Sequence, residues 1–279
     1  MAVGRTVETD APTGRDATAD ATHAVKVSGL TVVYGRTHKA LASFDFAAEK
    51  QKVTAVIGPN GSGKTSFLNA FTGAVPFKEG SISLFGTEVA KVTPRSMYKL
   101  GVSRTFQNLL IDDLSVEDNV RVGASSKVHA SVIESMPTAP RARRESRTRR
   151  DAAGAAIERM GLTALRKFKT SELSYGYRRR VEIARALASS PRVLLLDEPT
   201  AGMGPYESAE FADLMLVLAA LLDLCVVVVE HDMSVVRTAA SAVYVLRTGN
   251  VVDHGTPDRV LSNTEVKRIY LGDFAVRDA

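Results

Sequence analysis

The residues best suited to chemistry lie at 58–65, where the sequence reads Gly-Pro-Asn-Gly-Ser-Gly-Lys-Thr. This is a complete P-loop, and it stands between an apolar strand pattern at 53–57 and a helical pattern at about 65–71. Its glycines let successive N–H groups turn towards a polyphosphate, and the positive end of the helix dipole adds to the same site. Lys64 is expected to reach the β- and γ-phosphates, and the Thr65 hydroxyl to bind Mg²⁺. The pattern predicts a nucleoside triphosphate site formed by Gly58, Pro59, Asn60, Gly61, Ser62, Gly63, Lys64, Thr65 and Ser66.

Two carboxylates follow a second apolar strand pattern, at 192–196. The carboxyl ends of parallel strands face the crevice in which such sheets bind ligands, so Asp197 and Glu198 are expected there. Asp197 is placed to hold Mg²⁺, directly or through water. Glu198, one residue further on, is a candidate general base for an attacking water.

A third motif is Leu-Ser-Tyr-Gly-Tyr at 173–177, followed by an amphipathic helical pattern. Ser174 is expected to cap this helix, with its side-chain oxygen accepting an early backbone N–H. A serine and a glycine, Ser174 and Gly176, at a helix start form a second anion-binding device. One triphosphate does not need both devices, so the pattern indicates two chains that face each other across two nucleotides. Without that context, the segment is an ordinary capped helix with basic residues.

These motifs require an α/β fold with a parallel sheet. Strands are expected at 24–34, 43–47, 53–57, 80–86, 192–196, 225–229, 242–246 and 250–253. From about 93 to 188 the pattern is mainly helical, with a polar, arginine-rich linker after Pro137 and Pro140 and a helix near 149–160. We therefore expect an N-terminal antiparallel β part, a parallel core and an inserted helical subdomain within one domain at 24–279, after a disordered tail at 1–23.

Composition excludes several classes of protein. The 279 residues are 45% hydrophobic and 24% charged, which is ordinary for a globular chain with a buried core. The single cysteine, Cys225, lies in an apolar run, which excludes disulfides and a cysteine metal site and fits a reducing compartment. The apolar stretch 214–229 is shorter than a membrane span and contains Asp223, so it predicts a helix leading into a buried strand. No signal peptide is expected, because the first 23 residues lack an apolar core.

Charge is concentrated in one place. The net charge is +5, and residues 141–150 hold six arginines and one glutamate. A solvated charge run is the simpler interpretation, and a specific anion site is the other.

In this order and spacing, the motifs resemble those of the ATP-binding subunits of ABC transporters, over about 25–274. Segment 58–65 matches the Walker A motif, 193–198 the Walker B motif and 173–177 the signature motif. The resemblance implies a P-loop NTPase with a RecA-like parallel core, ATP and Mg²⁺ as cofactors, and ATP hydrolysis. It also implies an aromatic contact with adenine by Tyr34, a contact with Mg²⁺ and water by Gln107, and a γ-phosphate contact by His231.

Further segments resemble the LivG-like subgroup, which powers import of branched-chain amino acids and related polar solutes. They are 103–108, the Tyr-Gly variant of the signature, 201–203, 230–233 and 270–273. Segments 178–185 and 266–272 also resemble the ATPase of lipopolysaccharide export, so a lipid exporter is the alternative. The resemblance implies a second ATP-binding subunit, membrane permease subunits and, indirectly, an external solute-binding protein. It places the chain at the cytoplasmic face of the membrane as a peripheral subunit.

Two other classes of function fit less well. An ABC-type ATPase acting on nucleic acid would use the basic segment 141–150, but the chain has neither long heptad repeats nor a second ATPase half, so we expect no nucleic acid partner. A P-loop kinase or GTPase leaves the signature segment and His231 unexplained. The chain also departs from the family at Tyr177, where a polar residue is usual, and at Gly204, where Asp or Asn is usual; both leave the hydrolysis rate open.

Overall fold

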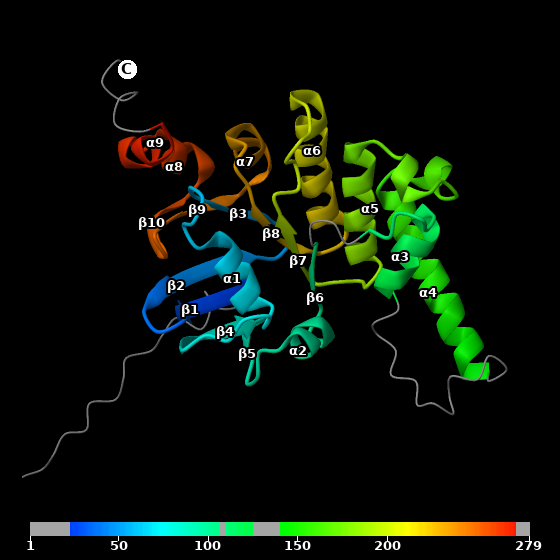
Figure 1. Cartoon of the computed structure of the whole chain (residues 1–279), viewed down its shortest axis with the longest axis horizontal. Helices are drawn as coiled ribbons and strands as arrows, with labels where there is room; N and C mark the ends of the chain where they lie inside the picture. Colours follow the sequence, from blue (N-terminus) through cyan, green and yellow to red (C-terminus); the bar gives the residue numbers. More distant parts are fainter. Residues whose placement is uncertain (1–22, 106–109, 125–139, 272–279) are drawn as a thin grey trace, which may run out of the picture.

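The computed structural model describes residues 23–105, 110–124 and 140–271, with β1 at His23–Tyr34 as its first element. Within these ranges the chain forms two sheets and a group of helices to one side (Figure 1). Gln107 and residues 1–22 of the expected tail lie outside the described residues.

The first sheet is antiparallel, with the order β2-β1-β4-β5. Its strands are β1, β2 at His38–Glu49, β4 at Glu79–Leu84 and β5 at Thr87–Glu88. Phe44 and Phe46 of β2 point into the core, where their rings lie 4.9 and 5.0 Å from the ring of Phe67 in the helix after the P-loop. This sheet is the antiparallel β part that the sequence predicts.

The second sheet has six strands in the order β10-β9-β3-β8-β7-β6. They are β3 at Val53–Ile57, β6 at Val102–Arg104, β7 at Val193–Asp197, β8 at Cys225–Val229, β9 at Ala242–Arg247 and β10 at Asn250–Gly255. All neighbours are parallel except β9 and β10, which form an antiparallel hairpin at Thr248–Gly249. The central strands are mostly apolar and almost fully buried because both faces of the sheet are covered, as is typical of parallel sheets.

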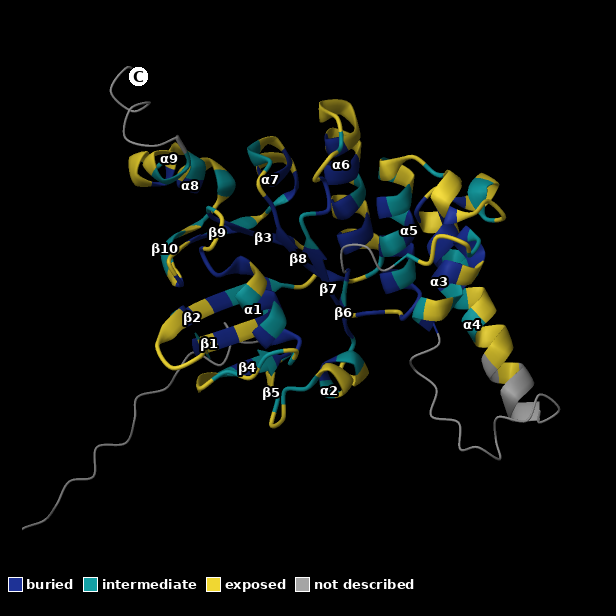
Figure 2. Cartoon of the chain, viewed as in Figure 1, coloured by how far each residue is buried: buried dark blue, intermediate teal, exposed yellow. Residues whose placement is uncertain are grey.

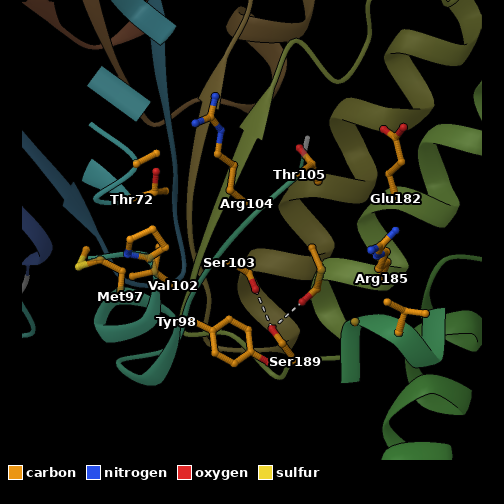
Figure 3. A pocket seen from close by; sticks show the side chains of 15 residues that line it. Thr72, Met97, Tyr98, Val102, Ser103, Arg104, Thr105, Glu182, Arg185 and Ser189 are labelled. Carbon is orange, nitrogen blue, oxygen red and sulfur yellow. Dashed lines mark hydrogen bonds between the residues drawn. The ribbon is translucent and has the colours of Figure 1, made fainter. Parts of the chain in front are cut away.

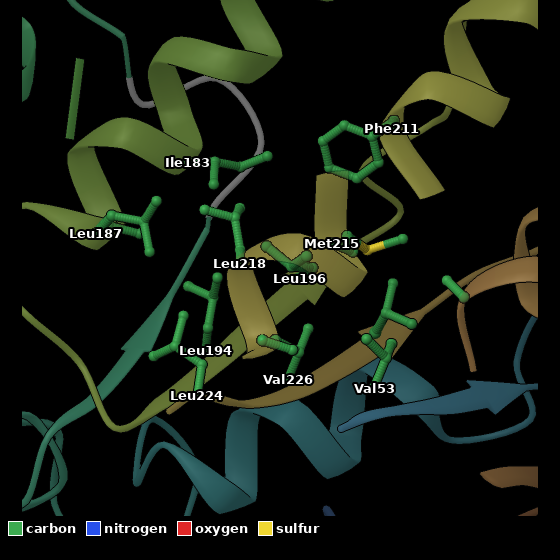
Figure 4. Packing of buried hydrophobic residues seen from close by; sticks show 14 of the residues in the cluster. Val53, Ile183, Leu187, Leu194, Leu196, Phe211, Met215, Leu218, Leu224 and Val226 are labelled. Carbon is green, nitrogen blue, oxygen red and sulfur yellow. The ribbon is translucent and has the colours of Figure 1, made fainter. Parts of the chain in front are cut away.

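Helices and the first sheet cover opposite faces of the six-stranded sheet. One face packs against α5 at Tyr175–Leu187 and α6 at Pro205–Leu221, and Figure 4 shows Leu194, Leu196 and Val226 beneath them. The other face packs against α1 at Lys64–Phe71 and the antiparallel sheet. Figure 2 shows this layering as a buried sheet between half-exposed elements.

The remaining helices complete the layers. They are α2 at Pro94–Lys99, α3 at Val116–Ala124, α4 at Pro140–Arg159, α7 at Met233–Ala239, α8 at Pro257–Ser262 and α9 at Thr264–Leu271, with short 3₁₀ turns at Thr163–Leu165 and Thr170–Glu172. Helices α3, α4 and α5 pack together as the helical group on the right of Figure 1. No helix within the described ranges combines the length and apolar character needed to cross a membrane.

One local expectation is wrong, and one strand was not expected. The segment predicted as an arginine-rich linker is the first half of α4, because arginine is a strong helix former and Pro140 occupies a helix start, where its missing N–H costs nothing. The segment expected to be mainly helical contains β6, which pairs with β7 at the edge of the six-stranded sheet. A strand of three residues has too little sequence to show a period, so its partner decides its conformation.

Candidate functional site

The P-loop joins β3 to α1 and curls tightly against its neighbours. Gly58 has φ 155° and Gly63 has φ 113°, within the range that disfavours residues with a side chain. A Cβ atom on Gly58 would lie 2.3 Å from the Leu246 carbonyl oxygen, and one on Gly63 would lie 2.5 Å from the Ala40 carbonyl oxygen. Glycine is therefore required at both positions for the loop to take this shape.

Lys64 is the first residue of α1 and its side chain turns back over the loop. Its Nζ donates hydrogen bonds to the carbonyl oxygens of Gly58 at 2.7 Å and Pro59 at 3.0 Å. Burial lowers the pKa of Lys64, and the negative charges of Glu198 and Asp197 oppose this shift. The cation thus lies close to both carboxylates at the edge of the sheet, as the sequence predicts. Gly63, the N-cap of α1, has no side chain to bond the first N–H groups of the helix. These N–H groups therefore remain available to an anion held by the P-loop.

The register of the strands explains why distant residues meet here. Val229, at the end of β8, pairs with Val56 of β3 on one side and with Asp197 of β7 on the other. The three strands therefore end at the same level. Gly58, Glu198 and the loop after β8 follow directly, so the P-loop and the carboxylates share one edge.

Asp197 is held by an arginine that the sequence analysis did not single out. Arg104, at the end of β6, places its Nη2 2.8 Å from Asp197 Oδ2 and donates from Nη1 to Asn69 Oδ1 of α1 at 2.6 Å. The two charged side chains are only 5% and 14% exposed. An arginine at the end of a strand beside the predicted Mg²⁺ residue was the available signal, but β6 itself was not recognised.

Glu198 and His231 lie together. His231 Nε2 is 2.8 Å from Glu198 Oε1, and the two side chains are 39% and 32% exposed. Glu198 has φ 46°, a left-handed conformation that is costly outside glycine and that clusters at functional sites. Its N–H donates to the Val229 carbonyl oxygen at 2.9 Å, which fixes this unusual turn.

A buried glutamate joins the two loops that carry this pair. Glu230 is 2% exposed, and its Oε1 accepts from the hydroxyl and the N–H of Thr200, at 2.6 and 3.0 Å. Its Oε2 accepts from the N–H groups of His231, at 2.9 Å, and Asp232, at 3.3 Å. The sequence alone does not reveal this role of Glu230, because its four donors come from two loops about 30 residues apart along the chain.

The signature segment lies elsewhere on the chain. Ser174 is the N-cap of α5, as predicted, but the predicted side-chain hydrogen bond is not formed; instead the Ser174 carbonyl accepts from the Arg178 N–H at 3.0 Å. Ser174 and Gly176 line a small cavity of about 100 Å³ with Met203 and Glu207, and the lining includes no P-loop residue. The structure therefore does not bring the signature segment to the P-loop of its own chain.

The remaining predicted residues are easily placed. Tyr34 ends β1 and is 38% exposed, as a ring available for stacking would be. Gln107 belongs to a segment outside the described residues. Thr65 and Asp197 offer a hydroxyl and a carboxylate, which suits Mg²⁺ because this ion usually takes its other ligands from phosphates and water. Among the described residues no cluster of three His, Cys, Asp or Glu side chains could hold a metal alone.

A larger cavity of about 430 Å³ lies between the six-stranded sheet and the helical group. Figure 3 shows Tyr98 and Arg104 on one side of it and Glu182 and Arg185 of α5 on the other, with Ser189 next to Tyr98. Ser103 Oγ and Ser189 Oγ are 2.7 Å apart across its floor. Arg104 thus reaches this cavity as well as Asp197.

Fold and site together define a P-loop nucleotide-binding protein with a separate signature-type helix start. The family described as "ABC transporter" matches residues 41–201. The high-affinity branched-chain amino acid transport ATP-binding proteins BraF of Pseudomonas aeruginosa and LivG of Escherichia coli are each 32% identical over 250 residues, which is 89% of this chain and 98% of each relative. A crystal structure of the ADP conformation of an ATP-binding cassette of an ABC transporter superposes with a TM-score of 0.78 at 28% identity, covering 90% of this chain and 99% of the other.

The chain belongs to the ABC transporter family, in which it is a nucleotide-binding ATPase subunit. The resemblance and the α/β P-loop fold expected from the sequence are thereby confirmed.

Proposed function

We propose that the chain is the ATP-hydrolysing subunit of an importer for a branched-chain amino acid or a similar polar solute, at the cytoplasmic face of the membrane. The observation that carries this proposal is the single edge where Lys64, Asp197, Glu198 and His231 converge, in a chain matched over nearly its full length by relatives named for such transport. The relatives' names favour import over lipid export. Residues 24–279 form the ATP-binding domain in this proposal, with the helical subdomain at about 93–188.

Phosphate binding falls to the P-loop. Lys64 exchanges its bonds to the Gly58 and Pro59 carbonyls for bonds to the β- and γ-phosphates, which neutralises more charge than two carbonyl dipoles do. The hydroxyl of Thr65 and the carboxylate of Asp197 hold Mg²⁺, which supplies charge neutralisation on the phosphates when bound. Tyr34 stacks on the adenine, and Gln107 keeps the role that the family resemblance implies.

Glu198 is the proposed general base. Its carboxylate accepts a proton from the water that attacks the γ-phosphate, and His231 orients that carboxylate and contacts the γ-phosphate. The turn at Glu198 and the bonds made by Glu230 fix the backbone of the two loops before the reaction, so little reorganisation of the loops is needed as charge develops.

A second subunit completes each site in this proposal. Ser174 and Gly176 make an anion-binding helix start that does not reach the P-loop of the same chain. Two subunits facing each other bring the segment of one to the nucleotide held by the other. ATP then stabilises the closed pair by its higher affinity for that state, and loss of the γ-phosphate releases it.

The cavity between the sheet and the helical group is the proposed contact for a permease segment. Arg104 lines this cavity and also bonds Asp197, so it connects the cavity wall to that carboxylate. A partner that moves this wall therefore acts on the predicted Mg²⁺ residue. An external solute-binding protein takes part only through the permease.

The test is Glu198→Gln, which keeps the shape of the side chain and removes the base. We expect ATP binding to remain and phosphate release to fall by about 10²- to 10⁴-fold, the usual contribution of general base catalysis. Size-exclusion chromatography with ATP should show accumulated dimers. Glu79→Gln, in exposed β4 of the other sheet, is the matched control. Phosphate release at the normal rate in Glu198→Gln would exclude the assigned base.

A further inference from the structure

The first half of α4 is rich in arginine, and positions 144, 146–148 and 150 are exposed. Residues 141–150 hold six arginines and one glutamate, an excess equal to the net charge of +5 of the whole chain. Arg144, Arg147 and Arg150, spaced three residues apart, follow one face of the helix and are exposed. The side chain of Arg147 is 86% exposed. The rest of the chain is therefore electrically balanced, and this helix carries its basic character.

Arg147 contributes little to the stability of the fold. Arg147 faces Asp151 at 4.0 Å, and both side chains are largely exposed, a geometry that usually adds little. The second half of α4 differs, because Ala153, Ala156 and Ile157 are buried in the core. Along the chain, α4 thus begins with a charged half that extends away from the other helices and ends with a half packed into the core (Figure 1).

The charged half of α4 extends towards the same side of the molecule as the cavity proposed to contact the permease (Figure 1). That cavity is lined by α2, by Val122 and Gly123 at the end of α3, and by the last turn of α5. In Figure 1 α2 and the end of α3 lie at the lower side, and the first half of α4 extends beyond them in the same direction. A membrane that surrounds a permease docked there would face this end of α4.

We infer that the arginine-rich half of α4 binds the anionic headgroups of the membrane that holds the permease, an inference that rests on the proposed function. Guanidinium groups pair with phosphate through two parallel hydrogen bonds, and several of them on one helix sum their attraction to an anionic surface. The helix has no apolar face in this half to insert among acyl chains, so the contact is electrostatic and lies at headgroup level.

Nucleic acid fits this surface less well. Single-stranded RNA and DNA are bound by basic grooves combined with aromatic side chains on which bases stack. Residues 140–151 contain no aromatic residue. A phosphate surface without bases is the better match for an arginine-rich helix without aromatic residues.

The experiment is sedimentation of the full chain with large vesicles, either of phosphatidylcholine alone or with about one third phosphatidylglycerol. The variant is Arg144→Gln/Arg147→Gln/Arg150→Gln. The matched control, Lys50→Gln/Lys78→Gln/Arg268→Gln, removes the same charge from exposed positions outside α4. Circular dichroism checks that both variants are folded, and binding to a single-stranded oligonucleotide is measured in parallel.

We expect binding to anionic vesicles only, weakened by added salt. Each arginine near an anionic surface changes the partition constant about fivefold, so the α4 variant should bind about a hundredfold more weakly and the control close to normally. Equal loss in both variants, or binding unchanged in the α4 variant, overturns the inference. So does oligonucleotide binding that exceeds vesicle binding and is lost in the α4 variant.

The assay contains no permease and no ATP. Failure of vesicle binding therefore leaves the proposed ATPase function untouched, and loss of phosphate release in Glu198→Gln says nothing about α4. The two proposals fail independently.

Discussion

Replacing Arg104 by glutamine should destabilise the chain more than any exposed arginine change. Arg104 and Asp197 form a pair whose side chains are 5% and 14% exposed, with nitrogen and oxygen 2.8 Å apart. Removing one partner leaves a largely buried carboxylate without its counter-charge, which typically costs about 3–5 kcal/mol. The bond from Arg104 to Asn69 is lost as well, so α1 loses its tie to β6.

Urea denaturation followed by circular dichroism measures the change. The free energy of unfolding is determined for Arg104→Gln, for Asp197→Asn and for the double variant. Because both single variants leave an unpaired group and the double variant does not, the double should be more stable than the sum of the single losses by about 0.5–3 kcal/mol. Arg178→Gln is the matched control, since Arg178 and Asp112 are 2.6 Å apart but 32% and 59% exposed. It should cost less than about 1 kcal/mol.

Two outcomes would refute this reasoning. One is additivity within about 0.5 kcal/mol, which would mean that the two groups do not interact energetically. The other is an equal cost for Arg104→Gln and Arg178→Gln, which would mean that burial does not decide the strength of the pair.

Three further predictions concern subunit exchange, acid stability and thiol reactivity. A mixture of Lys64→Ala and Ser174→Arg chains, each inactive alone, should recover phosphate release, because a mixed pair has one intact P-loop opposite one intact signature segment; continued inactivity would argue against shared sites between copies. Burial opposes ionisation of Asp253, but hydrogen bonds to its carboxylate outweigh burial and hold its pKa below the usual 3.8. The stability that the ionised carboxylate adds is therefore present above pH 3.8 and is lost as the pH falls through the lowered pKa. Asp253→Asn should therefore lower the urea midpoint by more at pH 7 than in acid below pH 3.8; an equal loss at both pH values would contradict the assignment. Burial raises the pKa of Cys225 to about 12, so its thiol should react with an aromatic disulfide reagent at pH 8 only after urea is added, and rapid reaction of the folded chain would disprove this.

Local motifs were the most predictable part of this molecule. The P-loop, the strand before it and the helix after it follow from a continuous stretch, since glycine geometry and a following helix are both written within about 20 residues. The buried strands β7 and β8 were equally clear, because continuous apolar runs are typical of a covered parallel sheet.

Features that depend on tertiary contact were not predictable. β6 has three residues and becomes a strand by pairing with β7. Arg104 and Glu230 owe their roles to partners far away in sequence, Asp197 and Thr200. A favourable residue type at the correct position is also not sufficient. Ser174 is the N-cap of α5, yet its hydroxyl does not accept a hydrogen bond from the first turn of the helix.

The buried side chain of Glu230 connects the two loops that carry Glu198 and His231. One of its oxygens accepts hydrogen bonds from the loop after β7 and the other from the loop after β8. The spacing of Glu198 and His231 therefore depends on a buried carboxylate that lies outside the proposed phosphate contacts. Shortening or turning that one side chain would shift both loops at once. A screen for chains that hold nucleotide but hydrolyse it slowly should for this reason recover buried positions as well as exposed ones.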